Sequence, residues 1–116
     1  MNKLSASLII AAATFGGFAA SAEGVVTGDN GMTLYTFDKD SAGTSTCYDD
    51  CAKNWPPYAA MDAAKKMPEG WTMIDRTDGT KQWAYDGKPT YFYVGDKKAG
   101  DTTGDGKGEV WHVLTD

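Results

Sequence analysis

The residues best suited to chemistry are two cysteines and one histidine. Cys47 and Cys51 are the only cysteines, and His112 is the only histidine, in a chain of 116 residues. Thiolate and imidazole groups are ligands that suit copper, so these three residues define a candidate metal site. The two cysteines could instead form a disulfide, the usual state of cysteine pairs in exported proteins, or take part in thiol redox chemistry.

The spacing of the cysteines makes a disulfide incompatible with a regular helix at 47–51. Side chains four residues apart on a helix have Cβ atoms about 5–6 Å apart, whereas a disulfide requires about 3.8 Å. Because exported proteins meet an oxidising compartment, we expect a disulfide between Cys47 and Cys51 and a backbone distorted from regular helix. If the helix is regular, the two thiols face one way and suit a soft metal. The C-x-x-x-C spacing differs from the C-x-x-C of thioredoxin-like sites, and metal binding needs free thiols. Thiol redox chemistry and metal binding remain alternatives to the disulfide.

The acidic loop from Asp101 to Glu109 is a candidate calcium site. Asp101 and Asp105 occupy positions one and five of an EF-hand count, and Gly106 occupies position six. Position three is Thr103 and position twelve is His112, so two expected ligands are missing. We expect a solvated turn rich in aspartate and glycine, with calcium binding as the alternative.

Signatures of catalysis are absent from the sequence. It contains no G-x-S-x-G elbow, no H-E-x-x-H motif and no phosphate-binding glycine loop. A Ser-His-Asp arrangement would depend on the single His112. We therefore predict a protein that is not an enzyme and that needs no cofactor, with copper, haem or calcium as alternatives.

An aromatic and acidic motif occurs twice, 56 positions apart. When each residue is matched with the residue 56 positions later, the two motifs align and predict an internal duplication. Each unit is too small to bury a core alone. We expect the aromatic residues to fill one core, and the aspartates to cap turns or to accept hydrogen bonds from tyrosine hydroxyls. A ligand surface for a sugar or a flat ring such as haem is the alternative. The matched pairs are Tyr35 with Tyr91, Phe37 with Tyr93, Asp40 with Asp96, and Trp55 with Trp111.

The elements that position these residues are mostly strands. Side chains alternate between the two faces of a strand, so the aromatic residues of each motif lie on one face. Turn sequences at 29–31, 77–79 and 86–87 predict hairpins. Short helices are expected within 47–54 and 59–66, each stopped by proline, and a loop over 96–108. The fold class is all-β or β-dominated: a small single domain built from two duplicated strand-turn-strand units, about 24–57 and 71–116, with one or two short helical segments.

The first 22 residues have the form of a secretory signal peptide. Lys3 precedes an apolar run, and Ala20-Ser21-Ala22 provides a small-residue cleavage site. The run is too interrupted to span a membrane, so we expect no membrane insertion after cleavage. The remaining domain, 23–116, has ten basic and 16 acidic residues. This charge disfavours nucleic acid and anionic lipid, which leaves a small ligand or a protein as possible partners.

The motif residues carry a resemblance to a known family. Tyr35-x-Phe37-x-x-Asp40 and Tyr91-x-Tyr93-x-x-Asp96 both fit the pattern Y-x-[FWY]-x-x-D. The chain resembles the bacterial secreted repeats described as predicted lipoproteins with that motif, over essentially its whole mature length. It departs from the lipoprotein name because no cysteine lies near the cleavage site. The resemblance implies a repeated domain of uncharacterised function. We predict a periplasmic or secreted, non-catalytic binding or structural module, with a metal-binding or thiol-redox protein as alternatives.

Mass spectrometry tests the signal peptide and the disulfide together. Protein recovered from its own exported compartment should begin at Glu23 and be two hydrogens lighter than the reduced chain, because Cys47 and Cys51 are oxidised. Native mass spectrometry should show no added metal or haem. An added copper, zinc or haem mass would instead support a site that includes His112.

Overall fold

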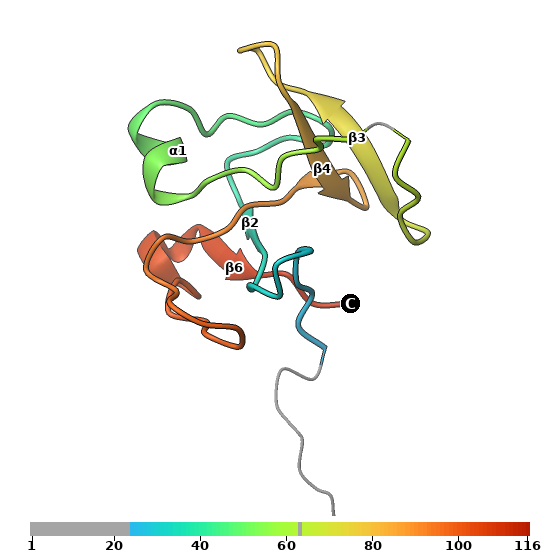
Figure 1. Cartoon of the computed structure of the whole chain (residues 1–116). Helices are drawn as coiled ribbons and strands as arrows, with labels where there is room; N and C mark the ends of the chain where they lie inside the picture. Colours follow the sequence, from blue (N-terminus) through green and yellow to red (C-terminus); the bar gives the residue numbers. More distant parts are fainter. Residues whose placement is uncertain (1–23, 63) are drawn as a thin grey trace, which may run out of the picture.

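The chain forms short antiparallel strands with little helix (Figure 1). The computed structural model describes residues 24–62 and 64–116, so the predicted signal peptide lies outside the described residues. The strands form a two-stranded sheet, β2-β6, and a three-stranded sheet, β3-β4-β5. This confirms the β-dominated fold class. The elements are β2 (Tyr35–Phe37), α1 (Asp50–Asn54), β3 (Trp71–Asp75), β4 (Lys81–Tyr85), β5 (Lys88–Pro89), the 3₁₀ turn η3 (Lys107–Glu109) and β6 (Trp111–Val113).

The three predicted hairpins are present. Strands β3 and β4 pair from Trp71↔Tyr85 to Asp75↔Lys81, and the 77–79 turn lies between them. Strands β4 and β5 are joined by Asp86 and Gly87, whose φ values of 51° and 81° are the left-handed pair that a two-residue turn requires. The 29–31 turn lies inside a bridge between residues 27 and 33. Turn chemistry therefore specifies the local chain reversals.

The two repeats meet at Tyr35 and Tyr91. The backbone N–H of Tyr35 donates to the carbonyl of Tyr91 at 2.8 Å, and the N–H of Tyr91 donates to the carbonyl of Tyr35 at 3.0 Å. This is the reciprocal pair of an antiparallel bridge. Because the two residues are motif counterparts, the bridge lies on a pseudo-two-fold axis that relates the repeats.

Around this axis each repeat pairs with the end of the other. Strand β2, from the first repeat, pairs with β6 at the end of the second, and the two lie side by side in Figure 1. In the related half, 91–94 runs along 54–57. The N–H of Asp38 donates to Val110 O at 2.8 Å, and the N–H of Val94 donates to Asn54 O at 3.0 Å, at counterpart positions. The repeats are thus interlocked rather than placed end to end.

A stack of four aromatic rings fills the core between the repeats. Phe37 stacks on Trp111 with ring centroids 4.1 Å apart, Trp111 on Trp55 at 3.9 Å, and Trp55 on Tyr93 at 4.2 Å. The order of the stack is symmetric. The two tryptophans stack on each other, and each also stacks on the motif aromatic of the other repeat, Trp111 on Phe37 and Trp55 on Tyr93. Tyr35 and Tyr91 are fully buried beside this stack.

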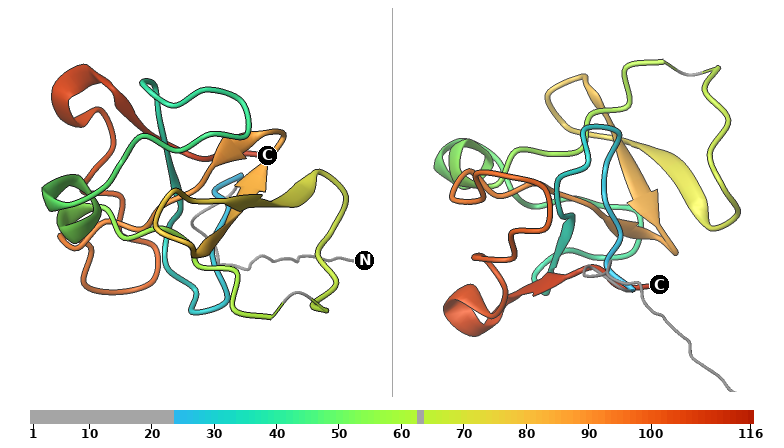
Figure 2. Two further views of the ribbon diagram at one scale, coloured as in Figure 1. Left: turned by 90° about the horizontal axis from the view of Figure 1, so that it is seen from above. Right: turned by 60° about the horizontal axis from the view of Figure 1, so that its bottom comes forward.

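A second core lies against the three-stranded sheet. Its buried members include Leu34, Tyr58 and Trp83, with Trp71 and Tyr85 packed partly buried against them. In both views of Figure 2, β3 and β4 lie on the opposite side of the molecule from α1 and η3. The sheet and its core therefore extend the molecule beyond the part where the repeats interlock.

The helix predictions are only partly right. Within 47–54, helix is confined to α1, so Cys47 lies outside it. The predicted helix at 59–66 is wrong for the residues described there. Ala59 bridges to Gln82, and the N–H of Ala60 donates to Lys81 O at 3.0 Å, because strand β4 offers this segment a partner. The predicted loop at 96–108 is present as far as residue 106, and the 3₁₀ turn η3 begins at Lys107.

Replacing Asp49 with glycine should stabilise the protein. Asp49 has φ 55° and ψ −124°, a conformation suited to glycine, within the turn closed by the Cys51 N–H and Tyr48 O at 3.0 Å. Backbone strain of this kind costs about 1–3 kcal/mol, partly offset by the greater freedom of glycine in the unfolded chain. Asp49→Gly should therefore raise the free energy of unfolding by about 1 kcal/mol, measured by urea denaturation.

The matched control is Asp50→Gly in the first turn of α1. Glycine there should lower the free energy of unfolding by up to about 1 kcal/mol, because the position is helical. Equal destabilisation by both substitutions would show that Asp49 is not strained.

Candidate functional site

The duplicated motifs are joined by hydrogen bonds that cross between the repeats. The hydroxyl of Tyr35 donates to Asp96 Oδ2 at 2.8 Å, and the hydroxyl of Tyr91 donates to Asp40 Oδ2 at 2.5 Å. Each tyrosine therefore bonds the aspartate of the other motif. The sequence indicated that the aspartates would cap turns or accept hydrogen bonds from tyrosine hydroxyls, but it contained no signal that the pairs would cross.

The second carboxylate oxygen of each aspartate holds a loop. Asp40 Oδ1 accepts the backbone N–H of Thr46 at 2.8 Å and its hydroxyl at 2.9 Å. Asp96 Oδ1 accepts the same two groups of Thr103 at 2.9 and 2.6 Å. The second loop is one residue longer, so Thr103 takes the role at one position beyond the counterpart of Thr46. Each aspartate thus fixes one tyrosine and one loop.

The buried tyrosines are held in their neutral form. Burial raises the pKa of Tyr35, and hydrogen bonding to Asp96 adds to the rise, although the Gly104 N–H donated to the hydroxyl opposes it. Burial also raises the pKa of Tyr91, followed by its hydrogen bond to Asp40. A phenolate would be desolvated and placed beside a carboxylate. These hydroxyls therefore act as structural donors over the physiological pH range.

Arg76, the only arginine in the chain, extends this network and is itself buried. Its Nη2 donates to Cys47 O at 2.7 Å, and its Nη1 donates to Ser45 Oγ at 3.1 Å. Ser45 Oγ lies 2.5 Å from the hydroxyl of Tyr91. The guanidinium thus connects the cysteine loop to the crossed tyrosine–aspartate pair. Sequence reasoning missed this residue, although a solitary arginine beside a hairpin turn was visible.

The structure places the candidate metal ligands in two different settings. Cys47 and Cys51 form a disulfide, with Cα atoms 5.2 Å apart, and Cys47 is buried. His112 is half exposed, and its Nε2 lies 2.7 Å from Asp38 Oδ2. Among residues 24–62 and 64–116, no three histidine, cysteine or acidic side chains gather to hold a metal ion. Metal binding by these residues stays a prediction that requires reduction of the disulfide.

The candidate calcium residues bind nearby backbone groups. Asp101 Oδ2 accepts the N–H groups of Lys97 and Lys98 at 2.8 and 3.1 Å. Asp105 Oδ1 accepts the N–H of Val113 at 3.1 Å. These bonds order the loop and attach it to β6. They give the two carboxylates a local structural role, and calcium binding remains a prediction.

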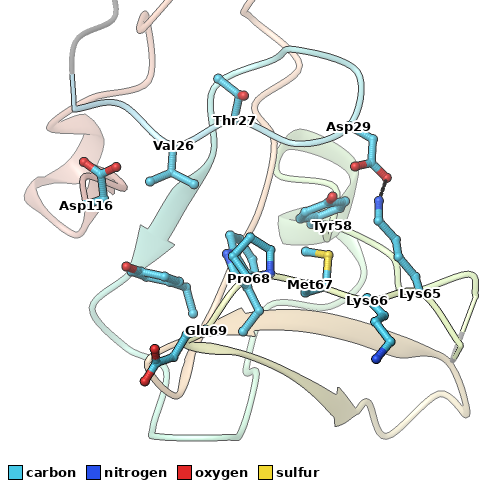
Figure 3. A pocket seen from close by; sticks show the side chains of 12 residues that line it. Val26, Thr27, Asp29, Tyr58, Lys65, Lys66, Met67, Pro68, Glu69 and Asp116 are labelled. Atoms are coloured by element: carbon cyan, nitrogen blue, oxygen red, sulfur yellow. Dashed lines mark hydrogen bonds and ion pairs between the residues drawn. The ribbon is translucent and has the colours of Figure 1, made fainter.

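A pocket of about 420 Å³ lies away from the motif residues (Figure 3). It is bounded by the N-terminal hairpin, the segment 65–71 and Tyr85 of β4. Trp71 lies between two other lining rings: Tyr58 packs edge-on at 5.9 Å and Tyr85 is tilted at 5.2 Å. The sequence did not predict this pocket, because its residues come from segments that share no motif.

Charged side chains surround the aromatic residues of the pocket, Tyr58, Trp71 and Tyr85. Asp29 and Lys65 form an ion pair on one side of the pocket, drawn as a dashed line in Figure 3. Hydrogen bonding between them lowers the pKa of Asp29 and raises that of Lys65. Glu69 and Asp116 line the pocket on the other side, and Lys66 also lines it. The site therefore combines an apolar wall with charges of both signs.

Alkaline unfolding should report the two buried tyrosines. In an unfolded chain tyrosine titrates near pH 10. Tyr35 and Tyr91 have raised pKa values when folded, so their contribution to stability is complete below about pH 10 and is lost as pH rises further. Above about pH 10, the contribution of each tyrosine to the free energy of unfolding should fall by about 1.4 kcal/mol per pH unit. Urea unfolding between pH 8 and 12 measures the slope.

The matched variant is Tyr35→Phe. It removes one titrating group, so its free energy of unfolding should fall less steeply with pH than that of the wild-type protein. Identical slopes would contradict the assignment of a raised pKa to Tyr35.

The comparisons with known proteins agree with the internal duplication. A family model described as a secreted repeat of unknown function matches residues 18–59 and again 72–115. No curated protein and no solved structure gave a significant match. Within the described part of the chain, no helix is long and apolar enough to cross a membrane. With two matches that together cover most of its length, the chain belongs to this family of secreted repeats of unknown function.

Proposed function

We propose that the protein is a non-catalytic binding module of the periplasm or the extracellular medium, and that its ligand occupies the pocket shown in Figure 3. Its family is described as secreted, and the predicted signal peptide supports export. The observation that carries the proposal is the pocket itself, in which three aromatic rings and several charged groups face one space.

The size and lining of the pocket suit a small organic ligand. Its volume of about 420 Å³ lies within the roughly 300–1,000 Å³ typical of small-molecule sites. The apolar part of the lining includes Val26, Met67 and Trp71. Such a surface supplies contact area, and the surrounding polar groups supply orientation and selectivity.

The pocket is built on side chains that the fold already holds in place. Tyr58 is a buried member of the second core, and Met67, Trp71 and Tyr85 pack against that core. Strands β3 and β4 fix the backbone positions of Trp71 and Tyr85, which are direct partners in the ladder. A preformed site loses less conformational entropy on binding than a site that must be ordered.

The titratable groups of the pocket support binding without catalysis. The pKa of Asp29 is lowered and that of Lys65 is raised by their mutual hydrogen bond, so both stay charged at neutral pH. Burial raises the pKa of Tyr58, and Asp29 raises it further. A general acid or base works best with a pKa near the operating pH. None of these shifts brings a group to that range.

Nuclear magnetic resonance with a small panel of compounds tests this function. The panel contains neutral sugars, short peptides, organic cations and organic anions. At least one class should shift the backbone amide signals of Val26, Met67 and Trp71, because these residues line the pocket. If no compound perturbs these signals, the pocket is not a ligand site.

A pocket-filling variant provides the control. Thr27→Trp places a bulky ring at an exposed position that lines the pocket, and it should abolish the shifts. Thr72→Trp adds the same side chain at an exposed position of β3 outside the lining, and it should leave them intact. Equal loss in both variants would show that the signal does not come from this pocket.

A further inference from the structure

We infer that the ligand of this pocket is an organic cation, such as a quaternary or substituted ammonium group carried on a small apolar body; this inference rests on the binding site proposed above. Two independent features of the lining point to positive charge. They are a corner of aromatic rings and a pair of carboxylates.

The aromatic corner presents the kind of surface that attracts cations. Trp71 has Tyr58 edge-on at an interplanar angle of 84° and Tyr85 tilted at 53°. All three residues line the pocket, and Trp71 and Tyr85 are partly exposed. The negative faces of tryptophan and tyrosine attract ammonium groups, and aromatic side chains are the usual surface that recognises quaternary ammonium ligands. A neutral ligand would gain only the apolar contact.

The charge balance of the lining favours the same sign. The ion pair between Asp29 and Lys65 is neutral as a unit. Glu69 and Asp116 form no ion pair with any described residue, whereas Lys66 is the one remaining cation of the lining. Figure 3 places Glu69 and Asp116 on the side of the pocket opposite Asp29 and Lys65. A cation on that side would be attracted by both carboxylates.

The test compares acetylcholine with 3,3-dimethylbutyl acetate, its neutral isostere, in which carbon replaces the quaternary nitrogen. The two compounds have the same shape, so any difference in affinity reports the charge. The cation should bind with a dissociation constant about tenfold lower, given the usual strength of cation–π contacts. Titration of the Val26 and Trp71 amide signals measures both constants. Equal or tighter binding of the neutral ester, or no binding of acetylcholine, would overturn the inference.

Glu69→Gln tests the contribution of the carboxylate. Glu69 is exposed, so the substitution should not disturb the core. It should weaken acetylcholine binding several-fold and leave binding of the neutral ester unchanged. The control is Glu109→Gln, an exposed glutamate outside the pocket, which should affect neither compound. An equal effect of both substitutions on acetylcholine would also overturn the inference.

These outcomes separate this inference from the proposed function. If neutral compounds of the panel shift the pocket amides and acetylcholine does not, the binding site stands and the cation assignment is wrong. If no compound shifts those amides, both the site and the assignment are wrong.

Discussion

The antiparallel bridge between Tyr35 and Tyr91 is the constraint on which the rest of the structure depends. Among residues 24–62 and 64–116, it is the one point where counterpart residues of the two repeats exchange both backbone hydrogen bonds. On either side of this bridge, β2 runs beside β6, and the segment after Tyr91 runs along the end of the first repeat. The repeats therefore interlock, and the two-stranded sheet is complete only when β2 of the first repeat pairs with β6 of the second.

The same axis explains why large aromatic side chains recur at the matched positions. Interlocked repeats bring Trp55 against Trp111, so the domain gains a continuous stack of rings that a single repeat could not build. The crossed tyrosine hydroxyls are satisfied by aspartates that also order the 40–46 and 96–103 loops. A domain of fewer than 100 residues has few apolar side chains to bury, so a shared core and a disulfide compensate for its size.

Sequence reasoning succeeded where the signal was local or repeated. The hairpin at Asp86-Gly87 and the Cys47–Cys51 disulfide were predicted from turn chemistry and compartment, and both are present. It failed at 59–66, where hydrogen bonding to β4 outweighed helix propensity. The crossing of the tyrosine–aspartate pairs and the pocket beside Trp71 depend on contacts between distant segments, which spacing along the chain does not reveal. The second core and the pocket use residues outside the motif.

Double-mutant cycles on the motif residues test the interlocked arrangement most directly. The crossed pair Tyr35→Phe with Asp96→Ala is compared with the pair from one repeat, Tyr35→Phe with Asp40→Ala, by urea unfolding. The structure predicts a coupling free energy of about 1–2 kcal/mol for the crossed pair, because the two side chains share a buried hydrogen bond to a carboxylate. It predicts a coupling close to zero for the pair within one repeat. Coupling confined to that second pair would mean that each repeat satisfies its own motif, and it would contradict the interlocked fold.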